Sequence, residues 1–284
     1  MKMAFFLILA VTAQTLENVI QKRYDLNTDP HKLSLWMYSL MLAVSALPVF
    51  LLQLRGDLYF DVQTLLYGAV FAGCYFAAML FTIKAVGEGS LALTALFLSY
   101  SLVIPAAVGV LLLHEQLSQI HIVGILMLLV SLYFVGRPGG QVRITGKWVL
   151  CIAIAFFGNG LCVASQKMYL VHSGGRGRAL FMITALTMII TALAVVCACK
   201  KGFSRLTPRN GAPLAVLYGV SNGLMNTFVM LLAAYPASIV FPTISGGGII
   251  LTYLISRFVY KERLSSDQNI GFVIGVLAVV ALNL

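Results

Sequence analysis

Four polar side chains near the end of the first apolar run have the types and spacing that could do chemistry. Gln14, Glu17 and Gln21 recur at helical spacing and would share one face of a helix over residues 3–21, with Asn18 beside them. A carboxyl group inside a membrane span costs about 2.5 to 3.5 kcal/mol, so it is seldom kept without a role. We expect this face to line a polar cavity. The alternative is that Glu17 is a structural group paired with a neighbouring helix.

The same stretch recurs 145 residues later, where residues 158–169 align on residues 13–24. The matching polar positions are Gln14 with Asn159, Gln21 with Gln166, Lys22 with Lys167 and Tyr24 with Tyr169. Glu17, however, corresponds to Cys162. The carboxylate occurs in one copy only, so the charge of the predicted site is asymmetric.

The composition is that of an integral membrane protein. The 284 residues are 60% hydrophobic and 10% charged, with a mean hydropathy of +0.96, which leaves too little polar surface to cover a water-soluble globule. Spanning helices need about 17 to 25 residues, and the connections between such runs are too short for a soluble catalytic domain. Suitable apolar runs cover residues 3–21, 33–53, 63–84, 90–113, 120–136, 147–170, 177–199, 211–234, 237–259 and 267–283. We predict an all-α membrane protein with ten transmembrane helices.

The charged, cysteine and histidine residues argue against nucleic-acid and metal binding. The net charge is +10, but the basic residues are spread over the connections between helices, as in a polytopic membrane protein. The connections after the odd-numbered runs hold 14 of the 19 Lys and Arg residues, which by the positive-inside rule places both termini outside. The five cysteines fall within predicted spans and the four histidines lack ligand spacing, so we expect no metal and no cofactor.

The chain contains two repeats. Their second halves match more closely than their first halves, because residues 90–136 align without a gap on residues 237–283. We predict one five-helix unit at 1–136, a second at 147–284, and a connecting loop at 137–146. Since five is odd, the second unit enters the membrane from the opposite side, and the units are inverted repeats. Such units can exchange conformations as alternating access requires. This favours a transporter, with a channel or a membrane enzyme as alternatives.

A Glu-x-Leu-Ser turn, with a glycine nine residues after the Glu, follows the fourth run of each unit. It is Glu115-Gln116-Leu117-Ser118 in the first unit and Glu262-Arg263-Leu264-Ser265 in the second. On this doubled motif the whole chain resembles the drug/metabolite transporter superfamily, in its EamA-like ten-helix branch. The resemblance implies a central cavity between the units, with runs 120–136 and 267–283 at the periphery. It also implies cytoplasmic termini, against the charge count, so the orientation stays open. Ser118 and Ser265 are predicted helix N-caps, and Glu115 and Glu262 are expected to stabilise the helix starts, with a role in gating as the alternative.

Runs 90–113 and 237–259 carry polar or helix-weakening residues at matching depth. Ser245 precedes three glycines, each of which weakens a helix by about 1 kcal/mol and lets a ligand or another backbone approach. The matching positions hold Ser99 and Tyr100, followed by Pro105. We predict substrate contact here, with helix packing as the alternative. Asn222 and Asn226 lie one turn apart in run 211–234 and fit either the site or interhelical hydrogen bonding.

These patterns predict a secondary transporter of a small polar metabolite. Glu17 favours an amino acid, an amine or an organic cation, and could also couple transport to protons. The predicted substrate-binding residues are Gln14, Glu17, Asn18, Gln21, Ser99, Tyr100, Asn159, Gln166, Asn222, Asn226, Ser245 and Gly247. A nucleotide sugar or an organic phosphate is the alternative cargo, with Lys22, Arg23 and Lys167 facing the phosphates.

A non-transporting scaffold or an intramembrane enzyme is the alternative from a different class. No nucleophile and base pair, phosphate loop or metal motif supports an enzyme, so we predict no catalytic residue. The expected location is a multi-pass position in a prokaryotic inner or plasma membrane. The expected partners are a small-molecule substrate and the lipid bilayer, without nucleic acid, and a homodimer is left open.

Overall fold

The chain is helical throughout the part that the structure describes. The computed structural model describes residues 2–29, 31–54, 56, 58–101, 103–113, 119–135, 144–200, 206–207, 209–232 and 237–282. These residues form no strand. Their helices are α1 (Lys2–Asp25), α2 (Leu35–Gln53), α3 (Val62–Glu88), α4 (Leu91–Tyr100), α5 (Val103–Leu113), α6 (Gln119–Val135), α7 (Gly146–Ser173), α8 (Arg178–Cys199), α9 (Ala212–Leu232), α10 (Ala237–Phe258) and α11 (Ser266–Leu282). The predicted all-α class is confirmed.

Each of the ten predicted apolar runs is helical, but run 90–113 is divided into α4 and α5. Pro105 has no N–H to donate to the Ser101 carbonyl one turn earlier, and Ile104 N donates to that carbonyl instead, at 3.0 Å. The Ser101 hydroxyl donates to Leu98 O at 2.6 Å. By contrast, α10 stays a single helix although it contains Pro242 and three glycines, and α2 stays a single helix with Pro48 inside it.

Five of the described helices are long and apolar enough to cross a membrane: α1, α2, α3, α7 and α8. Shorter apolar helices lie within residues 91–105, 122–135 and 266–281. Length and composition therefore support a multi-pass membrane protein.

Polar side chains fix where several helices begin. Asp61 starts α3 with a capping box, in which its carboxylate accepts from Thr64 N at 2.8 Å and Thr64 Oγ1 accepts from Asp61 N at 3.2 Å. Ser265 starts α11 in the same reciprocal way with Gln268. The predicted N-cap at Ser265 is confirmed, whereas Glu115 and Ser118 lie outside the described residues.

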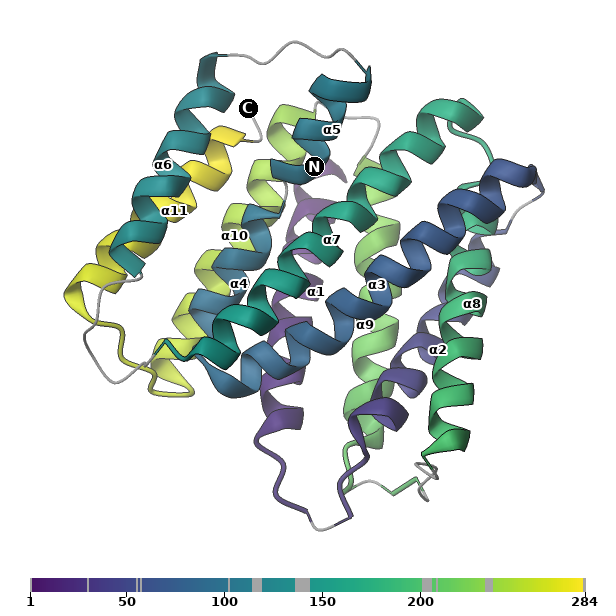
Figure 1. The fold of residues 1–284 in the computed structure, drawn as a ribbon, viewed down its shortest axis with the longest axis horizontal. Coiled ribbons are helices and arrows are strands. Elements are labelled where there is room, and N and C mark those ends of the chain that lie inside the picture. The colour runs from purple at the N-terminus through teal and green to yellow at the C-terminus, as the bar shows by residue number, and fades with distance from the viewer. Residues whose placement is uncertain are drawn as a thin grey trace.

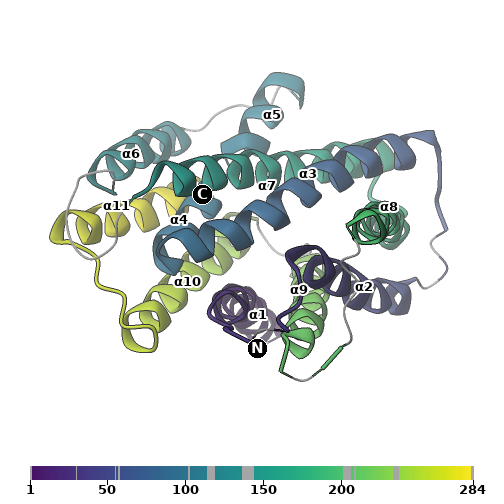
Figure 2. The ribbon, with the colours of Figure 1, turned by 60° about the horizontal axis from the view of Figure 1, so that its bottom comes forward.

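The helices lie in pairs that bring the two predicted units together. In Figure 1, α6 and α11 lie side by side at one edge and α2 and α8 at the other, with α1, α3, α4, α7, α9 and α10 between them. Figure 2 shows the same order from another side. Helix α1 packs on α9, and its repeat counterpart α7 packs on α3, the counterpart of α9. Likewise α1 packs on α10 as α7 packs on α4 and α5. Exchanging the two units reproduces these contacts.

Most of the largest buried cluster fills the space around α2, α8 and their neighbours. It includes the stacked rings of Tyr24 and Tyr38, with centroids 3.7 Å apart, and the stacked pair Tyr169 and Phe181.

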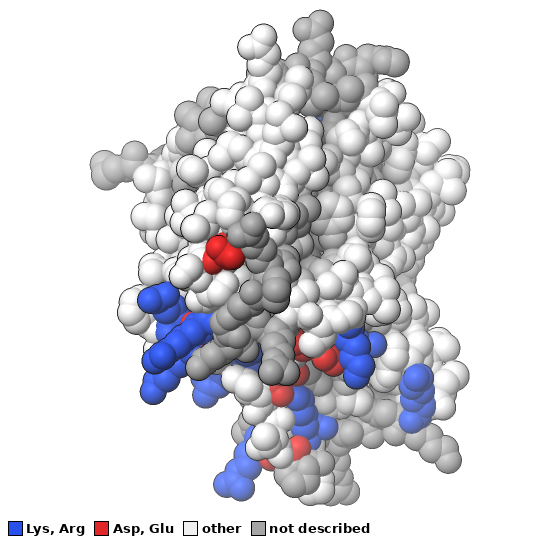
Figure 3. All heavy atoms as spheres, turned by 60° about the vertical axis from the view of Figure 1, so that its left-hand side comes forward, with Lys and Arg blue, Asp and Glu red and all other residues white. Residues whose placement is uncertain are grey.

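Lys and Arg gather toward the lower end of the face that Figure 3 shows, which is the end at which α1 finishes. We call this the basic end.

Candidate functional site

The carboxyl group of Glu17 lies between three helices in the middle of the fold. Asn222 of α9 donates through Nδ2 to Glu17 Oε2 at 3.2 Å, and Tyr75 of α3 donates to Asn222 Oδ1 at 3.3 Å. The Tyr218 ring, one turn before Asn222, lies beside the same carboxyl group. Helix α1 therefore presents the Glu17 carboxyl group to α3 and α9, where the Asn222 amide donates to it and Tyr218 lies beside it.

Three acceptor oxygens on one face of α1 are buried without a hydrogen-bond partner among the described residues. They are Oε1 of Gln14, Oε1 of Glu17 and Oε1 of Gln21. Buried polar atoms in folded proteins nearly always have a partner, so an unpaired set on one face needs an explanation. These are the three residues that helical spacing predicted on one face of the helix. The face therefore carries three buried hydrogen-bond acceptors, one of them on a carboxyl group.

The neighbours of this face come from α9 and α10. Gln21 Nε2 donates to the Tyr218 hydroxyl at 2.9 Å, and Asn18 Nδ2 donates to Thr252 Oγ1 at 3.1 Å. Gly248 lies so close to Gln14 that a Cβ atom there would approach Oε1 to 2.9 Å. We call the set formed by Gln14, Glu17, Asn18 and Gln21 with these neighbours the α1 polar face.

Two further predicted residues of α9 and α10 lie near the α1 polar face. Asn226 donates to the backbone carbonyl of Asn222 at 2.9 Å, so it extends the polar side of α9. Gly247 faces Val11 of α1, and a Cβ atom there would lie 3.2 Å from Val11 Cγ2. The glycines of α10 thus permit close packing on α1. The side chain of Ser245 lies outside the described residues.

The structure does not bring every predicted residue to this face. Tyr100 bonds to Ser131 of α6 at 2.5 Å, inside the cluster that α4 forms with α6 and α11. Ser99 donates to Ala95 O of its own helix at 3.0 Å. Asn159 of α7 donates to Ser101 Oγ at 2.7 Å, at the break between α4 and α5. Gln166 lies half-buried on α7.

Tyr75, Tyr218 and Thr252 belong to the site but were not predicted from the sequence. Each lies in an otherwise apolar span, where an isolated tyrosine or threonine is also an ordinary packing residue. The available signal was spacing, because Tyr218 precedes Asn222 by one helical turn and shares its face.

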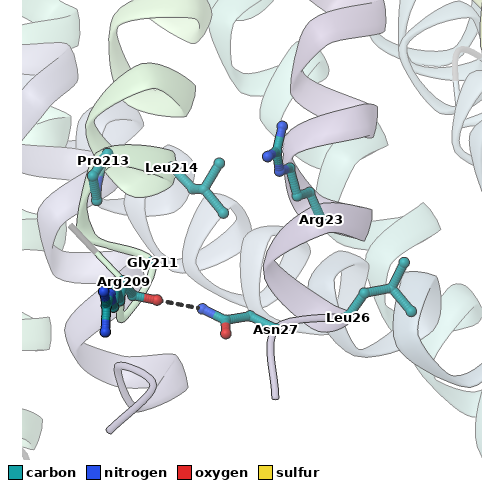
Figure 4. Close-up of a pocket in the computed structure, with 7 residues that line it drawn as sticks. All are labelled: Arg23, Leu26, Asn27, Arg209, Gly211, Pro213 and Leu214. Atoms are coloured by element: carbon teal, nitrogen blue, oxygen red, sulfur yellow. Dashed lines mark hydrogen bonds between the residues drawn. The ribbon is translucent and has the colours of Figure 1, made fainter. Parts of the chain in front are cut away.

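A hollow opens at the basic end between the end of α1 and the start of α9. Its volume is about 560 Å³, and its lining residues are Arg23, Leu26, Asn27, Arg209, Gly211, Pro213 and Leu214. Figure 4 shows the guanidinium groups of Arg23 and Arg209 pointing away from each other, while Asn27 donates to Arg209 O at 3.0 Å. The two cations therefore do not converge on one point.

A polar cluster lies at the end opposite the basic end, where α3 begins and α7 finishes. Asp61 Oδ2 accepts from Tyr59 at 3.0 Å and lies 2.9 Å from His172 Nε2. Desolvation opposes ionisation of Asp61, but hydrogen bonds from Thr64, His172 and Tyr59 outweigh it and hold the pKa of this carboxyl group well below its usual 3.8. The pair joins the first predicted unit to the second.

This depressed pKa predicts acid sensitivity. The unfolded chain binds a proton at Asp61 at a higher pH than the folded protein, so Asp61 contributes stability that is present above about pH 4 and is lost as the pH falls further. We expect Asp61→Asn, which keeps a capping oxygen, to flatten the dependence of the melting temperature on pH below about 4. Thermal unfolding over a pH series measures this. Equal slopes in the two proteins would refute the assignment.

The apolar helices are those of a multi-pass membrane protein, and the family match of its first part suggests a membrane transporter. Residues 1–137 match the model of the EamA-like transporter family. The match confirms the predicted resemblance to the drug/metabolite transporter superfamily.

Two further comparisons extend over more of the chain. An uncharacterized protein of Haemophilus influenzae is 25% identical over 192 residues, which are 64% of this chain and 62% of that protein. The match therefore spans less than two thirds of the relative. A solved crystal structure superposes with a TM-score of 0.61 at 15% identity, covering 98% of this chain and 96% of the other. This similarity shows that the fold is shared with a known structure.

Proposed function

We propose that this protein is a secondary transporter that moves a small polar metabolite with an amino group across the membrane by alternating access. The substrate class is an amino acid, an amine or an organic cation. The observation that carries the proposal is the set of unpaired buried acceptors on the α1 polar face, with the Glu17 carboxyl group in the middle. The predicted alternative, in which Glu17 pairs with a neighbouring helix, is supported by its contacts with Asn222 and Tyr218 of α9, neither of which carries a compensating charge.

The hydrogen-bonding types of the α1 polar face favour one of the two candidate cargoes. An ammonium group carries donors only, whereas a phosphate group presents acceptors, so unpaired acceptor oxygens match an amine. Gln14 and Gln21 are seven residues apart, which is about 10 Å along a helix. One ammonium would therefore bind Glu17 and one of the two glutamines. The other glutamine would accept from a second donor group of the same substrate.

The proposed architecture has ten transmembrane helices arranged as two inverted five-helix units, 1–136 and 147–284. Its support is the repeat in the sequence together with the helix contacts, which recur when the two units are exchanged. Rocking of one unit against the other would open the α1 polar face to each side in turn. We propose the inner membrane of a bacterium as the location.

Proton coupling is part of the proposal because Glu17 can hold either a proton or a cationic substrate. Its carboxyl group has one amide donor and no ion-pair partner within the described residues. Binding of the substrate would then release the proton. A transport rate that does not change with pH would contradict this coupling.

A nucleotide sugar or an organic phosphate is the second candidate cargo, and the arginine-lined hollow at the basic end favours it. Lys22, which was predicted to face the phosphates, instead pairs with Glu262 at 3.2 Å. Lys22 is therefore less available to bind a phosphate than the sequence predicted. We rank the amine first.

Solute flux into liposomes that contain only this protein tests the proposal. The probes are radiolabelled amino acids, polyamines, nucleotide sugars and sugar phosphates, each compared with empty liposomes. We expect uptake of at least one amine and none of the phosphorylated solutes. Uptake restricted to phosphorylated solutes would establish the second cargo. Absence of flux for every probe would favour the alternative of a scaffold or an intramembrane enzyme.

A further inference from the structure

A carboxylate from the second unit lies between two helices of the first unit, α1 and α4, at the basic end. Glu262 follows α10, and its Oε1 lies 3.2 Å from Lys22 Nζ of α1. Its Oε2 accepts from Ser90 Oγ at 2.9 Å and from Leu91 N at 3.0 Å, at the start of α4. Ser256 of α10 also donates to Oε2. Glu262 is thus a fully bonded carboxylate, unlike Glu17.

Lys22 is equally well held. Its ammonium donates to Val86 O at 3.2 Å and to Gly89 O at 3.4 Å, both at the end of α3. The side chains of Lys22 and Glu262 are 12% and 13% exposed. A second bond crosses between the units nearby, because the Tyr260 hydroxyl donates to Val19 O at 3.3 Å. We call Lys22, Ser90, Tyr260 and Glu262 the basic-end cluster.

The backbone of this segment is held in an uncommon conformation. Lys261, between Tyr260 and Glu262, has a φ of 55°, in the left-handed region that residues other than glycine seldom adopt. Tyr260 N bonds to Ile255 O at 3.2 Å and Glu262 N to Ser256 O at 3.1 Å. Such strain persists where the surroundings fix it, and it clusters at ligand clamps and switch regions.

The cluster lies on the route from the α1 polar face to the basic end. Asn18 bonds to Thr252 at the site, and one turn further along each helix Lys22 meets the group formed by Ser256 and Glu262. Helices α1 and α10 pack together along this line. A substrate that left the polar face toward the basic end would need these two helix ends to separate.

We propose that the basic-end cluster is a gate, in which Glu262 closes this end of the transport path and is released when the path opens. An ion pair suits this task. While the end is closed, each charge is compensated by the other. Once the helix ends separate, water solvates both charges, so neither state leaves an isolated buried charge. The inference rests on the proposed transport function. A permanent brace between the units is the structural alternative.

Hydrogen–deuterium exchange of the protein in phospholipid nanodiscs, without any substrate, tests the gate. The variants are Glu262→Gln and Lys22→Gln, and the reporters are the amides of α1 residues 18–24 and α10 residues 252–258. We expect exchange about tenfold faster at these reporters in both variants, because a weakened gate opens more often. Leu91 is not used as a reporter, since its amide bonds directly to Glu262.

Ser265→Ala is the matched control, because Ser265 lies three residues after Glu262 but caps α11. It should leave the reporters at their wild-type rates. The double variant should exchange no faster than the faster single variant, since both changes act on one gate. Unchanged reporters, or exchange that accelerates equally in all helices, would overturn the gate and leave a brace. Because the readout needs no substrate, failure of the amine proposal in the flux assay and failure of the gate are separate results.

Discussion

Replacing Glu17 by Gln is expected to abolish stabilisation of the purified protein by amines. A ligand at a hundred times its dissociation constant stabilises the folded state by about 2.7 kcal/mol, which is a readable rise in melting temperature. Gln keeps the size of the side chain and still accepts from Asn222, but it carries no charge to compensate an ammonium. Thermal shifts against amino acids, polyamines, drug-like cations, nucleotide sugars and sugar phosphates, at two pH values, measure the effect.

Glu88→Gln is the matched control, because Glu88 is exposed at the end of α3 and removing its carboxylate leaves the α1 polar face intact. This variant should keep the full response to amines. Stabilisation by phosphorylated ligands that survives Glu17→Gln would transfer the proposal to the second cargo and make Glu17 a structural group.

Gly219→Ala is expected to lower the free energy of unfolding by about 1 to 3 kcal/mol, the usual cost of overpacking. A Cβ atom at Gly219 would lie 2.2 Å from the backbone oxygen of Leu42 and 2.9 Å from Ser45 Cβ, where α9 crosses α2. Backbone cannot move aside as the end of a long side chain can. The two helices would have to separate, together with the contacts of Tyr218 and Asn222 on the same helix.

Gly73→Ala provides the comparison for this crossing, since a Cβ atom at Gly73 in α3 would meet nothing within 4 Å. Alanine is the better helix former by about 1 kcal/mol, so this variant should be neutral or more stable. Thermal unfolding in one detergent compares the two variants with the wild type. Equal melting temperatures for Gly219→Ala and Gly73→Ala would show that α9 does not depend on this close approach.

The fold was predictable as far as hydropathy and local chemistry determine it. Apolar runs give the helices, but Pro105 did not by itself predict a divided run, because α2 and α10 contain Pro48 and Pro242 and are not divided. Hydropathy does not show which side of such a helix faces the centre of the fold. Apolar residues lie on every side of α4, so its periodicity does not tell which side faces the centre. Tyr100 was therefore assigned to the site, whereas it bonds to Ser131 near the edge of the fold.

The candidate site was predictable on the helix where polar residues interrupt an apolar sequence. Helical spacing alone placed Gln14, Glu17 and Gln21 on one face. Their partners come from about 200 residues further along the chain, and no local pattern joins Glu17 to Asn222. Glu262 shows the same limit. Its motif was recognised, yet its partners at Lys22 and Ser90 depend on how the units are packed.

The position of Glu17 along α1 has an electrical consequence. It lies 15 residues after Lys2 and 8 residues before Asp25, so it is nearer the basic end of the helix. Moving one elementary charge across a membrane potential of 100 mV changes its free energy by about 2.3 kcal/mol. A cation that reaches Glu17 from the opposite end would cross roughly two thirds of that potential difference, and one that arrives from the basic end roughly one third. Membrane voltage would therefore act unequally on the two halves of the transport cycle.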